Sequence, residues 1–392
     1  MKTTETAVAL CAVGAEKAVS NELRKLDLKV EDSLYGRVRF KADTAGLYRA
    51  LMALRAADRV LLEIAGFRAA DFDALFEGTA AAAWERLVPN GMGLKVVKVR
   101  SNRSQLKAET SIQSIVHKAA AQRLCGKYKL SRLPEDGKAA EVRVYIEKDQ
   151  VSLLVDLCGE PLFKRGYRSE GGAAPLRETT AASMLLLSGW KRKFPLYDPF
   201  CGSGTILIEA AMYAWDMAPG LGRRFALEGL LIADEKIEKD IRDELRAKID
   251  FGRLVRIAGS DEDPRSVSIA ASNVERLRDI AEGRTPQKGI RLSDRPAPVE
   301  LKALPMGEAR APFPDAGFLV TNPPYGKRLG DQSRSEQTYG EMGGLAERFP
   351  GWKLALVTDH SGFESFFGRK ADSCREISNG AIPSYFFQYE LI

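Results

Sequence analysis

Histidine and cysteine are scarce in this sequence, and their scarcity excludes several kinds of site. The 392 residues include two histidines, His117 and His360, and five cysteines. Two isolated histidines exclude a histidine-rich metal centre. The cysteines are odd in number and widely scattered, which argues against a disulfide framework and a Cys-x-x-Cys metal site. We therefore expect no bound metal ion, and we expect most cysteines to be small buried hydrophobic residues.

Long apolar runs are also lacking, so we expect no segment that crosses a membrane. The apolar stretch 7–15 lies between Glu5 and Glu16 without a basic leader or cleavage pattern, which indicates a buried strand. Hydrophobic residues make up 45% of the chain and charged residues 29%, as in ordinary globular proteins. These features predict a cytoplasmic protein of roughly two or three domains.

Positive charge is modest overall but concentrated in one stretch. The net charge is +6, whereas residues 95–132 contain ten lysines and arginines and one acidic residue, Glu109. Such a stretch is a candidate nucleic-acid-binding patch. A solvated face spread around a helix is the alternative, and composition alone does not separate the two. The candidate contacts are Lys98, Arg100, Arg103, Lys107 and Lys118.

The N-terminal half predicts two small α+β modules, at 1–54 and 55–158. A turn at Lys148-Asp149 between two apolar stretches is typical of a β-hairpin in the second module. The predicted strands are 7–13, 36–40, 94–99, 141–146 and 151–156, and the predicted helices are 16–26, 43–53, 71–87 and 111–124.

A linker at 159–178 separates these modules from the rest of the chain, because residues 159–175 carry four glycines and two prolines. In residues 179–392, strands alternate with helices, which is the pattern of a parallel α/β sheet. The predicted strands are 193–198, 254–260, 317–321 and 353–357, followed by an antiparallel pair near 374–378 and 384–391.

A glycine-rich turn, Asp198-Pro199-Phe200-Cys201-Gly202-Ser203-Gly204-Thr205, follows the first of these strands. Its glycines allow a ligand to approach the backbone closely at a helix N-terminus. A P-loop needs Gly-Lys-Ser/Thr and a dinucleotide site needs a third glycine, and the turn has neither. An adenosine ligand without phosphates fits better, because Asp198 would repel a pyrophosphate and attract a cationic methionine group.

The second strand ends in Gly259-Ser260-Asp261-Glu262-Asp263-Pro264, where doubly wound sheets place a carboxylate for a ribose. Asp261 is the best acceptor for the ribose hydroxyls, Glu262 lies beside it, and Asp263 is an alternative cap for the following helix. Residues 216–250 form an inserted, mostly helical excursion, which is a candidate wall of the substrate pocket.

The most specific motif is Asn322-Pro323-Pro324-Tyr325, after a buried strand. An amino group conjugated to a base or carbonyl is a poor nucleophile, because its lone pair is delocalised. The Asn322 side-chain oxygen and the Pro323 carbonyl would accept its two hydrogens and turn the lone pair toward a methyl group on sulfur. Tyr325 can stack on a flat substrate. The motif predicts methyl transfer to a planar nitrogen, with a plain two-proline turn as the alternative.

Together these motifs resemble those of a known family. Residues 198–205, 259–264 and 321–329 are similar to the cofactor, ribose and catalytic motifs of class I methyltransferases that act on guanine N2. Residues 164–168 and 174–178 resemble the junction between an RNA-binding THUMP domain and the catalytic domain. The whole chain is similar to bacterial large-subunit rRNA guanine-N2 methyltransferases, in the short form without a fused second methyltransferase.

This resemblance implies an α/β fold with a Rossmann-like class I methyltransferase domain at 179–392. Its sheet would have seven mostly parallel strands with an antiparallel last strand, preceded by a ferredoxin-like part at 1–54 and a THUMP domain at 55–158. The implied cofactor is S-adenosylmethionine, and the implied partner is 23S rRNA or a pre-ribosomal particle.

The resemblance also implies roles for single residues. The basic stretch would contact RNA, with Arg165 and Arg168 of the linker as further phosphate contacts. The implied catalytic residues are Asn322, Pro323, Pro324 and Tyr325, and the implied cofactor-binding residues are Asp198, Phe200, Cys201, Gly202, Ser203, Gly204, Thr205, Asp261, Glu262 and Asn322.

The chain departs from the family near the third strand, where an acidic or amide residue usually holds the adenine amino group. Here the sequence is Glu300-Leu301-Lys302-Ala303-Leu304-Pro305. The adenine contact then falls to the backbone or to a displaced Glu300, with Asp315 as a weaker candidate.

Other substrates and another class of protein stay open. The Asn-Pro-Pro-Tyr loop also resembles those of DNA adenine and protein glutamine methyltransferases, although the N-terminal modules favour RNA. Among RNAs, tRNA guanine N2 is the main rival, because THUMP domains also serve tRNA enzymes. A non-catalytic RNA-binding or ribosome-assembly factor is the alternative of a different class, and the intact Asp198, Gly202, Gly204 and Asn322 count against it.

Overall fold

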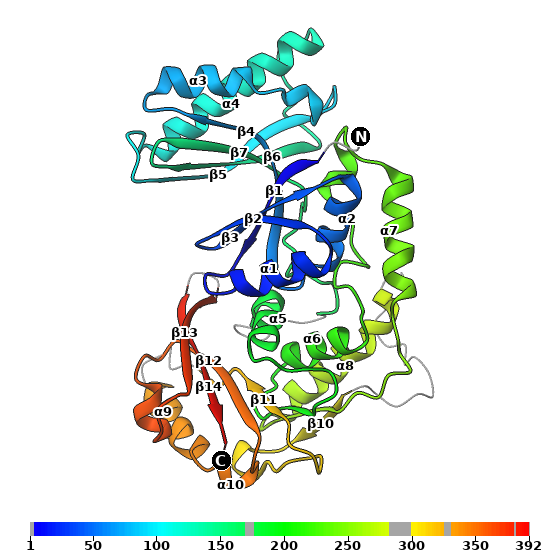
Figure 1. Ribbon diagram of the computed structural model, residues 1–392, viewed down its shortest axis with the longest axis vertical. Helices are drawn as coiled ribbons and strands as arrows, with labels where there is room; N and C mark the ends of the chain where they lie inside the picture. Colours follow the sequence, from blue (N-terminus) through cyan, green and yellow to red (C-terminus); the bar gives the residue numbers. More distant parts are fainter. Residues whose placement is uncertain (1–3, 169–175, 282–298, 325–330, 380–381, 392) are drawn as a thin grey trace.

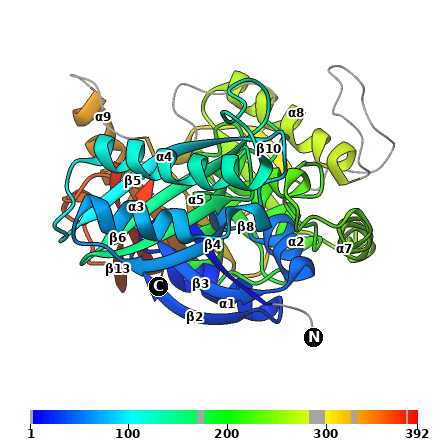
Figure 2. The same cartoon turned by 90° about the horizontal axis from the view of Figure 1, so that it is seen from above.

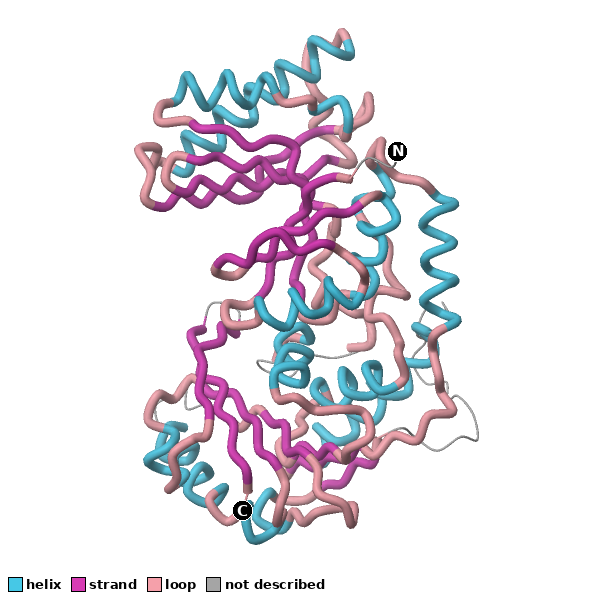
Figure 3. The backbone as a smooth tube through the Cα atoms, viewed as in Figure 1, coloured by secondary structure: helices cyan, strands magenta, loops and turns pink. Residues whose placement is uncertain are grey.

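The structure is a computed structural model that describes residues 4–168, 176–281, 299–324, 331–379 and 382–391. Within these residues it contains two seven-stranded sheets, one in each half of the chain. Figure 3 shows the sheets in magenta, one above the other, with helices α1 (Glu16–Lys25) and α5 (Glu178–Leu187) between them.

The N-terminal half forms one continuous sheet in the order β2-β3-β1-β4-β7-β6-β5. β4 pairs antiparallel with β1 on one side and β7 on the other, so it joins the modules predicted at 1–54 and 55–158. The predicted hairpin is confirmed, with positive φ at Lys148 and Asp149. The strands are β1 (Glu5–Cys11), β2 (Lys29–Leu34), β3 (Arg37–Ala42), β4 (Ala57–Arg68), β5 (Gly93–Asn102), β6 (Ala139–Glu147) and β7 (Gln150–Asp156).

Helices cover this sheet, and local caps decide where they begin. The Asp71 carboxylate accepts a hydrogen bond from the Ala74 N–H (2.8 Å) at the start of α3. The helix predicted over 71–87 is shorter than expected, because Trp84 turns into the core and its Nε1 donates to the Thr79 carbonyl (2.8 Å). The other helices are α2 (Thr44–Ala53), α3 (Phe72–Ala81) and α4 (Glu109–Tyr128), with a 3-10 turn at Trp84–Arg86.

The C-terminal half forms the predicted mostly parallel sheet, in the order β10-β9-β8-β11-β12-β14-β13. β14 is antiparallel to β12 and β13, and the strands from β10 to β12 are parallel. Because β8 lies between β9 and β11, the strand order reverses there and leaves a crevice at their carboxyl ends. The strands are β8 (Leu196–Asp198), β9 (Ile257–Asp261), β10 (Glu300–Ala303), β11 (Phe318–Thr321), β12 (Lys353–Thr358), β13 (Ser373–Asn379) and β14 (Ile382–Glu390).

Helices lie on both faces of this second sheet, with α5, α6 and α8 on one side and α9 and α10 on the other (Figure 1). In the described ranges, no helix combines the length and the apolar character needed to cross a membrane. The remaining helices are α6 (Thr205–Ala214), α7 (Glu235–Ala247), α8 (Pro264–Ala281), α9 (Asp331–Met342), α10 (Leu345–Arg348) and α11 (Phe363–Phe367), with 3-10 turns at Ala226–Gly229 and Met306–Glu308.

The inserted segment 216–250 does not wall the pocket, contrary to expectation. Its helix α7 packs on α2 of the N-terminal half, where Arg49 and Glu244 form an ion pair (2.9 Å) (Figure 1). No residue of this segment lies among the described residues that line the cavity discussed below. The insertion therefore fastens the two halves to each other.

Arg165 of the linker is buried, which corrects the expectation that it contacts RNA phosphate. Its Nε lies 3.4 Å from the Glu209 carboxylate on α6, and its Nη1 donates to the Leu162 carbonyl (2.6 Å). The buried Tyr167 hydroxyl donates to the same carboxylate (3.2 Å). Arg165 thus holds the linker against the helix that follows the glycine-rich turn.

Candidate active site

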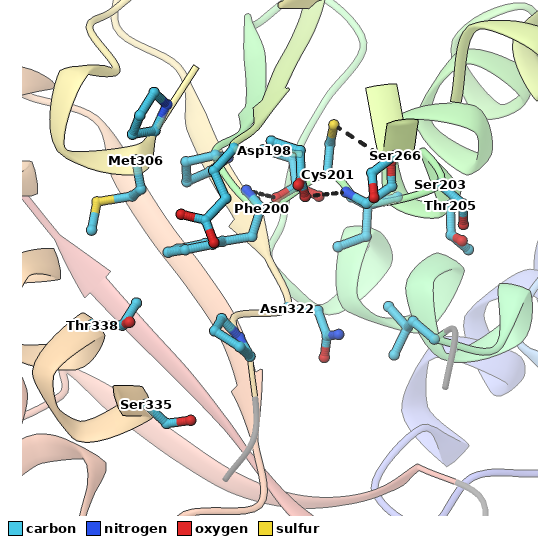
Figure 4. Close-up of a pocket in the computed structure, with 18 of the residues that line it drawn as sticks. Asp198, Phe200, Cys201, Ser203, Thr205, Ser266, Met306, Asn322, Ser335 and Thr338 are labelled. Atoms are coloured by element: carbon cyan, nitrogen blue, oxygen red, sulfur yellow. Dashed lines mark hydrogen bonds between the residues drawn. The ribbon is translucent and has the colours of Figure 1, made fainter. Parts of the chain in front are cut away.

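A cavity of about 700 Å³ opens at the carboxyl ends of β8, β9 and β11. Residues of all three predicted motifs line it, although the motifs lie far apart in the sequence (Figure 4). The predicted residues that line the cavity are Asp198, Phe200, Cys201, Gly202, Ser203, Thr205, Asp261, Glu262, Asn322 and Pro324.

The glycine-rich turn has the open backbone that the sequence predicts. Gly202 and Gly204 have φ values of +52° and +83°, in the left-handed region that favours glycine. Among the described residues, no heavy atom beyond its chain neighbours lies within 4 Å of where a Cβ would stand at Gly202. A Cβ at Gly204 would lie 3.0 Å from Ala270 Cβ, so its absence lets α8 pack closely. α6 begins at Thr205, and the turn therefore offers a ligand open backbone at a helix N-terminus.

Asp198 is buried and connects β8 to β11. Its Oδ1 accepts hydrogen bonds from Thr321 Oγ1 (2.6 Å) and from the Phe200 N–H (3.0 Å). Burial, together with the nearby Asp261 carboxylate, raises the pKa of Asp198 from 3.8 to about 7. A carboxyl group that is partly protonated at neutral pH attracts a cation less than the sequence suggested. Its clearest role is to hold together the strand ends that precede the glycine-rich turn and the Asn322 loop.

Asp261 is the last residue of β9 and Glu262 follows it, and both line the cavity. Asp261 accepts hydrogen bonds from the Gly202 N–H (2.9 Å) and from the Asp263 N–H (3.0 Å), so it also shapes the glycine-rich turn. Glu262 is exposed, and its carboxylate pairs with Arg334 on α9 (3.0 Å). Asp263 accepts a hydrogen bond from the N–H two residues further on (3.0 Å), which confirms that it caps α8.

The Asn322 loop follows β11 as predicted, and Asn322 and Pro324 line the cavity. Tyr325 lies outside the described residues, so its stacking role stays a prediction. Tyr339 on α9 was not predicted, and it is fully buried behind the loop. Its hydroxyl donates to the Pro324 carbonyl (3.0 Å) and lies 3.0 Å from Thr358 Oγ1. Tyr339 therefore fixes the backbone of the loop from the core side.

The end of the cavity beyond β9 is formed by residues 305–307, which follow β10. Glu300 is exposed at the start of β10, and Asp315 pairs with Arg256; neither lines the cavity. This arrangement supports the backbone alternative for an adenine contact. Residues of α9 line the same region and were not predicted, because no sequence motif marks them: Arg334, Ser335, Gln337, Thr338 and Glu341.

Five of the predicted RNA contacts lie on and between β5 and α4. Figure 2 looks down the long axis and shows α4 and α9 toward the same edge of the view, away from both termini, whereas Figure 1 shows them at opposite ends of that axis. Lys98 is half-buried and the others are exposed: Arg100 on β5, Arg103 and Lys107 after it, and Lys118 on α4.

Arg168 is turned into the protein, which corrects the expectation that it contacts RNA phosphate. Its Nη2 donates to the Leu176 carbonyl (3.0 Å) and to Thr205 Oγ1 (3.1 Å). Both acceptors belong to residues that line the cavity. Arg168 therefore belongs to the surroundings of the cavity rather than to the RNA-facing surface.

Comparison with known proteins identifies the family. Residues 165–386 match the family model described as "RMKL-like, methyltransferase domain", and residues 6–61 match the "RlmL ferredoxin-like domain". YpsC of Bacillus subtilis, provisionally named an RNA methyltransferase, is 35% identical over 98% of this chain and 95% of its own length. The ribosomal RNA large subunit methyltransferase K/L of Syntrophotalea carbinolica is 31% identical over 96% of this chain. This chain spans about half of that protein, 52% of its length.

A solved structure resembles the whole molecule. SMU.472, provisionally named a methyltransferase and solved in complex with S-adenosylhomocysteine, has 35% identity and a TM-score of 0.86. The alignment covers 100% of this chain and 99% of that one. The match to the methyltransferase model extends over the sheet, the glycine-rich turn and the Asn322 loop, so the chain belongs to the family of RMKL-like methyltransferases.

Proposed function

We propose that this protein transfers a methyl group from S-adenosylmethionine to the exocyclic N2 amino group of a guanosine in RNA, and that the RNA is 23S rRNA. One observation carries the proposal: the Asn322 loop and the glycine-rich turn line the same cavity (Figure 4). An electrophilic methyl group and an aligned planar amino group can therefore meet there.

The cavity fits S-adenosylmethionine, which supplies a methyl group on a sulfonium when bound. Its volume of about 700 Å³ is in the range of small-molecule sites. The open backbone at Gly202 lets a ligand approach closely, and the N-terminus of α6 offers N–H donors to its carboxylate group. Asp261 and Glu262 would accept hydrogen bonds from the ribose, and Phe200 and Met306 would pack on the adenine.

Asn322 and Pro323 would align the acceptor. The Asn322 oxygen and the Pro323 carbonyl would each accept one hydrogen of the guanine amino group, which directs its lone pair at the methyl group. Alignment of this kind replaces a strong base, since the amino group needs orientation more than proton removal. Pro323 is buried and Tyr339 holds the next carbonyl, so these acceptors are preorganised.

The N-terminal half would hold the RNA. We infer that residues 55–158 form a THUMP-type RNA-binding domain, and that the exposed cations of β5 and α4 contact phosphates. An RNA that reaches both α4 and α9 would run along the long axis of the molecule, because the two helices share an edge in Figure 2 and lie at opposite ends in Figure 1. The target guanosine would be flipped into the cavity, which costs a few kcal/mol and is easiest in unpaired regions.

A labelling experiment tests the proposal. The protein is given S-adenosylmethionine with a labelled methyl group and, in separate reactions, unmodified 23S rRNA, tRNA, DNA and protein. After digestion, we expect the label in N2-methylguanosine from 23S rRNA. Label confined to tRNA would establish the rival RNA substrate. Label confined to DNA adenine or protein glutamine, or in none of these, would contradict the proposal.

A further inference from the structure

An ion pair between the linker and α5 lies behind one end of the cavity, next to two of the residues that line it. Arg168 Nη2 lies 3.3 Å from Glu178 Oε1, the first residue of α5, and also donates to the Leu176 carbonyl and Thr205 Oγ1. Leu176 and Thr205 line the cavity. In Figure 4, Thr205 lies on the opposite side from Met306, so this ion pair and the proposed adenine contact mark opposite ends of the site.

Both members of the pair are withdrawn from water. The Arg168 side chain is 18% exposed and that of Glu178 is 8% exposed. Burial raises the pKa of Glu178, although Arg168 opposes the shift. Nε of Arg168 is buried without a hydrogen-bond partner among the described residues. A buried ion pair adds little net stability, because desolvation offsets the attraction. Stability therefore does not explain why the Arg168–Glu178 pair lies beside the cavity.

The order of chemical groups along S-adenosylmethionine determines which end of the molecule would lie near the Arg168–Glu178 pair. In S-adenosylmethionine the sulfonium stands between the adenosine and the amino-acid end. Asp261 and Met306 suit the adenosine, and the methyl group on sulfur has to face Asn322, which lies between Met306 and Thr205 in Figure 4. The amino-acid end then points toward Thr205 and Leu176, where the ion pair lies.

We propose that Arg168 and Glu178 recognise the zwitterionic amino-acid end of the cofactor, Arg168 facing its carboxylate and Glu178 its ammonium group. The charges are complementary, and the N-terminus of α6 adds N–H donors and a positive dipole on the carboxylate side. The inference rests on the proposed cofactor and on the role of Asn322, and it does not depend on which RNA is methylated.

Two ligands that differ only at this end test the proposal. S-adenosylhomocysteine carries the amino acid, whereas 5′-methylthioadenosine has the same nucleoside and sulfur without it. Isothermal titration calorimetry measures both affinities. Arg168→Gln should weaken binding of S-adenosylhomocysteine by roughly 10- to 100-fold, since a charged hydrogen bond is lost, and leave binding of 5′-methylthioadenosine within about twofold. Glu178→Gln should act on the same ligand alone, and Arg168→Lys should restore part of the loss.

Arg223→Gln is the matched control. Arg223 also ties the linker to the catalytic half, through the carbonyls of Glu160 and Pro161, and it does not line the cavity. This variant should bind both ligands as the wild type does. If Arg168→Gln weakens the binding of both ligands equally, or of neither, Arg168 does not recognise the amino-acid end and the proposal is wrong.

The outcomes separate this proposal from the proposed function. A wild-type protein that binds neither ligand overturns the cofactor assignment and this proposal together. Selective loss of S-adenosylhomocysteine in Arg168→Gln, in a protein that methylates no RNA, supports this proposal and contradicts the RNA substrate alone.

Discussion

We expect methyl transfer to depend most directly on Asn322, which lines the cavity. Asn322→Ala removes one of the two acceptors that align the amino group, while the cofactor still has the glycine-rich turn and Asp261. We expect turnover to fall by roughly 100-fold or more, as when one oxyanion-hole donor is lost, with cofactor affinity little changed. Single-turnover kinetics and calorimetry with S-adenosylhomocysteine measure the two effects. Unchanged turnover would contradict the role assigned to Asn322.

Asp198 should make the stability of the protein depend on pH. Its pKa in the folded protein is about 7, above the ordinary value of 3.8, because it is buried. The folded state therefore keeps a proton that the unfolded chain releases, and the stability from Asp198 is lost as pH rises from about 4 to about 7.

The variant Asp198→Asn stays neutral at every pH and isolates this effect. The unfolding free energy of the wild type, minus that of the variant, should be smaller at about pH 8 than at about pH 5. Urea unfolding at the two pH values measures it. A constant difference would mean that Asp198 is ionised alike in both states.

At the scale of elements, α9 holds the Asn322 loop in place through the hydrogen bond from Tyr339 to the Pro324 carbonyl. Tyr339→Phe removes the hydrogen bond to the Pro324 carbonyl and keeps the ring. We expect a loss of about 1 kcal/mol, which is roughly fivefold in turnover if it is felt only in the transition state. Tyr389→Phe is a matched control, because the buried Tyr389 hydroxyl has no hydrogen-bond partner among the described residues. Equal effects of the two changes would argue against a hold on the loop.

The segment after β5 should carry part of the RNA affinity. Reversing the charge of Arg100 and Arg103 to Glu removes two exposed cations. RNA binding should weaken, and the slope of log affinity against log salt should become shallower by roughly one to two units. Arg24→Glu with Lys25→Glu, on exposed positions of α1, controls for net charge. An unaltered slope would mean that these cations do not contact RNA and only form a solvated face.

Some elements escaped prediction for a physical reason. β2 is almost wholly exposed at the edge of its sheet, so its sequence lacks the alternation of a half-buried strand. β4 pairs on both sides, and Val60, Leu61 and Leu62 are all buried, which hides the period of two. Strands with one buried face, such as β6, were predicted because their alternation is intact.

At the scale of the whole molecule, buried charges join the two halves. Arg55 of the N-terminal half donates to the Met217 carbonyl beyond α6 (2.7 Å), and Arg165 pairs with Glu209. Arg165→Ala leaves the Glu209 carboxylate buried without this partner, and we expect a loss of about 3–5 kcal/mol in stability. RNA affinity of the folded protein should not change, because Arg165 does not reach the surface.

Thermal unfolding and RNA titration of the same variant measure these two effects. Arg224→Ala, which breaks an exposed pair with Glu228, should cost no more than about 1 kcal/mol. A large loss of RNA affinity at unchanged stability would instead indicate that Arg165 contacts RNA phosphate, as the sequence predicted.

Features whose chemistry is local could be predicted from the order of the residues alone. A glycine-rich turn, a carboxylate at a strand end and an Asn-Pro-Pro loop each require particular residues in order. The sequence therefore predicted Gly202, Asp261 and Asn322 as site residues, and all three line one cavity. The exposure of a side chain and the packing of a helix depend on residues that are distant in the sequence, so they could be known only from the tertiary structure. Arg165 is buried, and Arg168 is turned inward by its hydrogen bonds to Leu176 and Thr205. Tyr339 contacts the loop from a helix that carries no motif, and α7 packs on α2 instead of lining the cavity. The residue type gives the charge of a side chain, whereas the exposure of that side chain depends on how the whole chain packs.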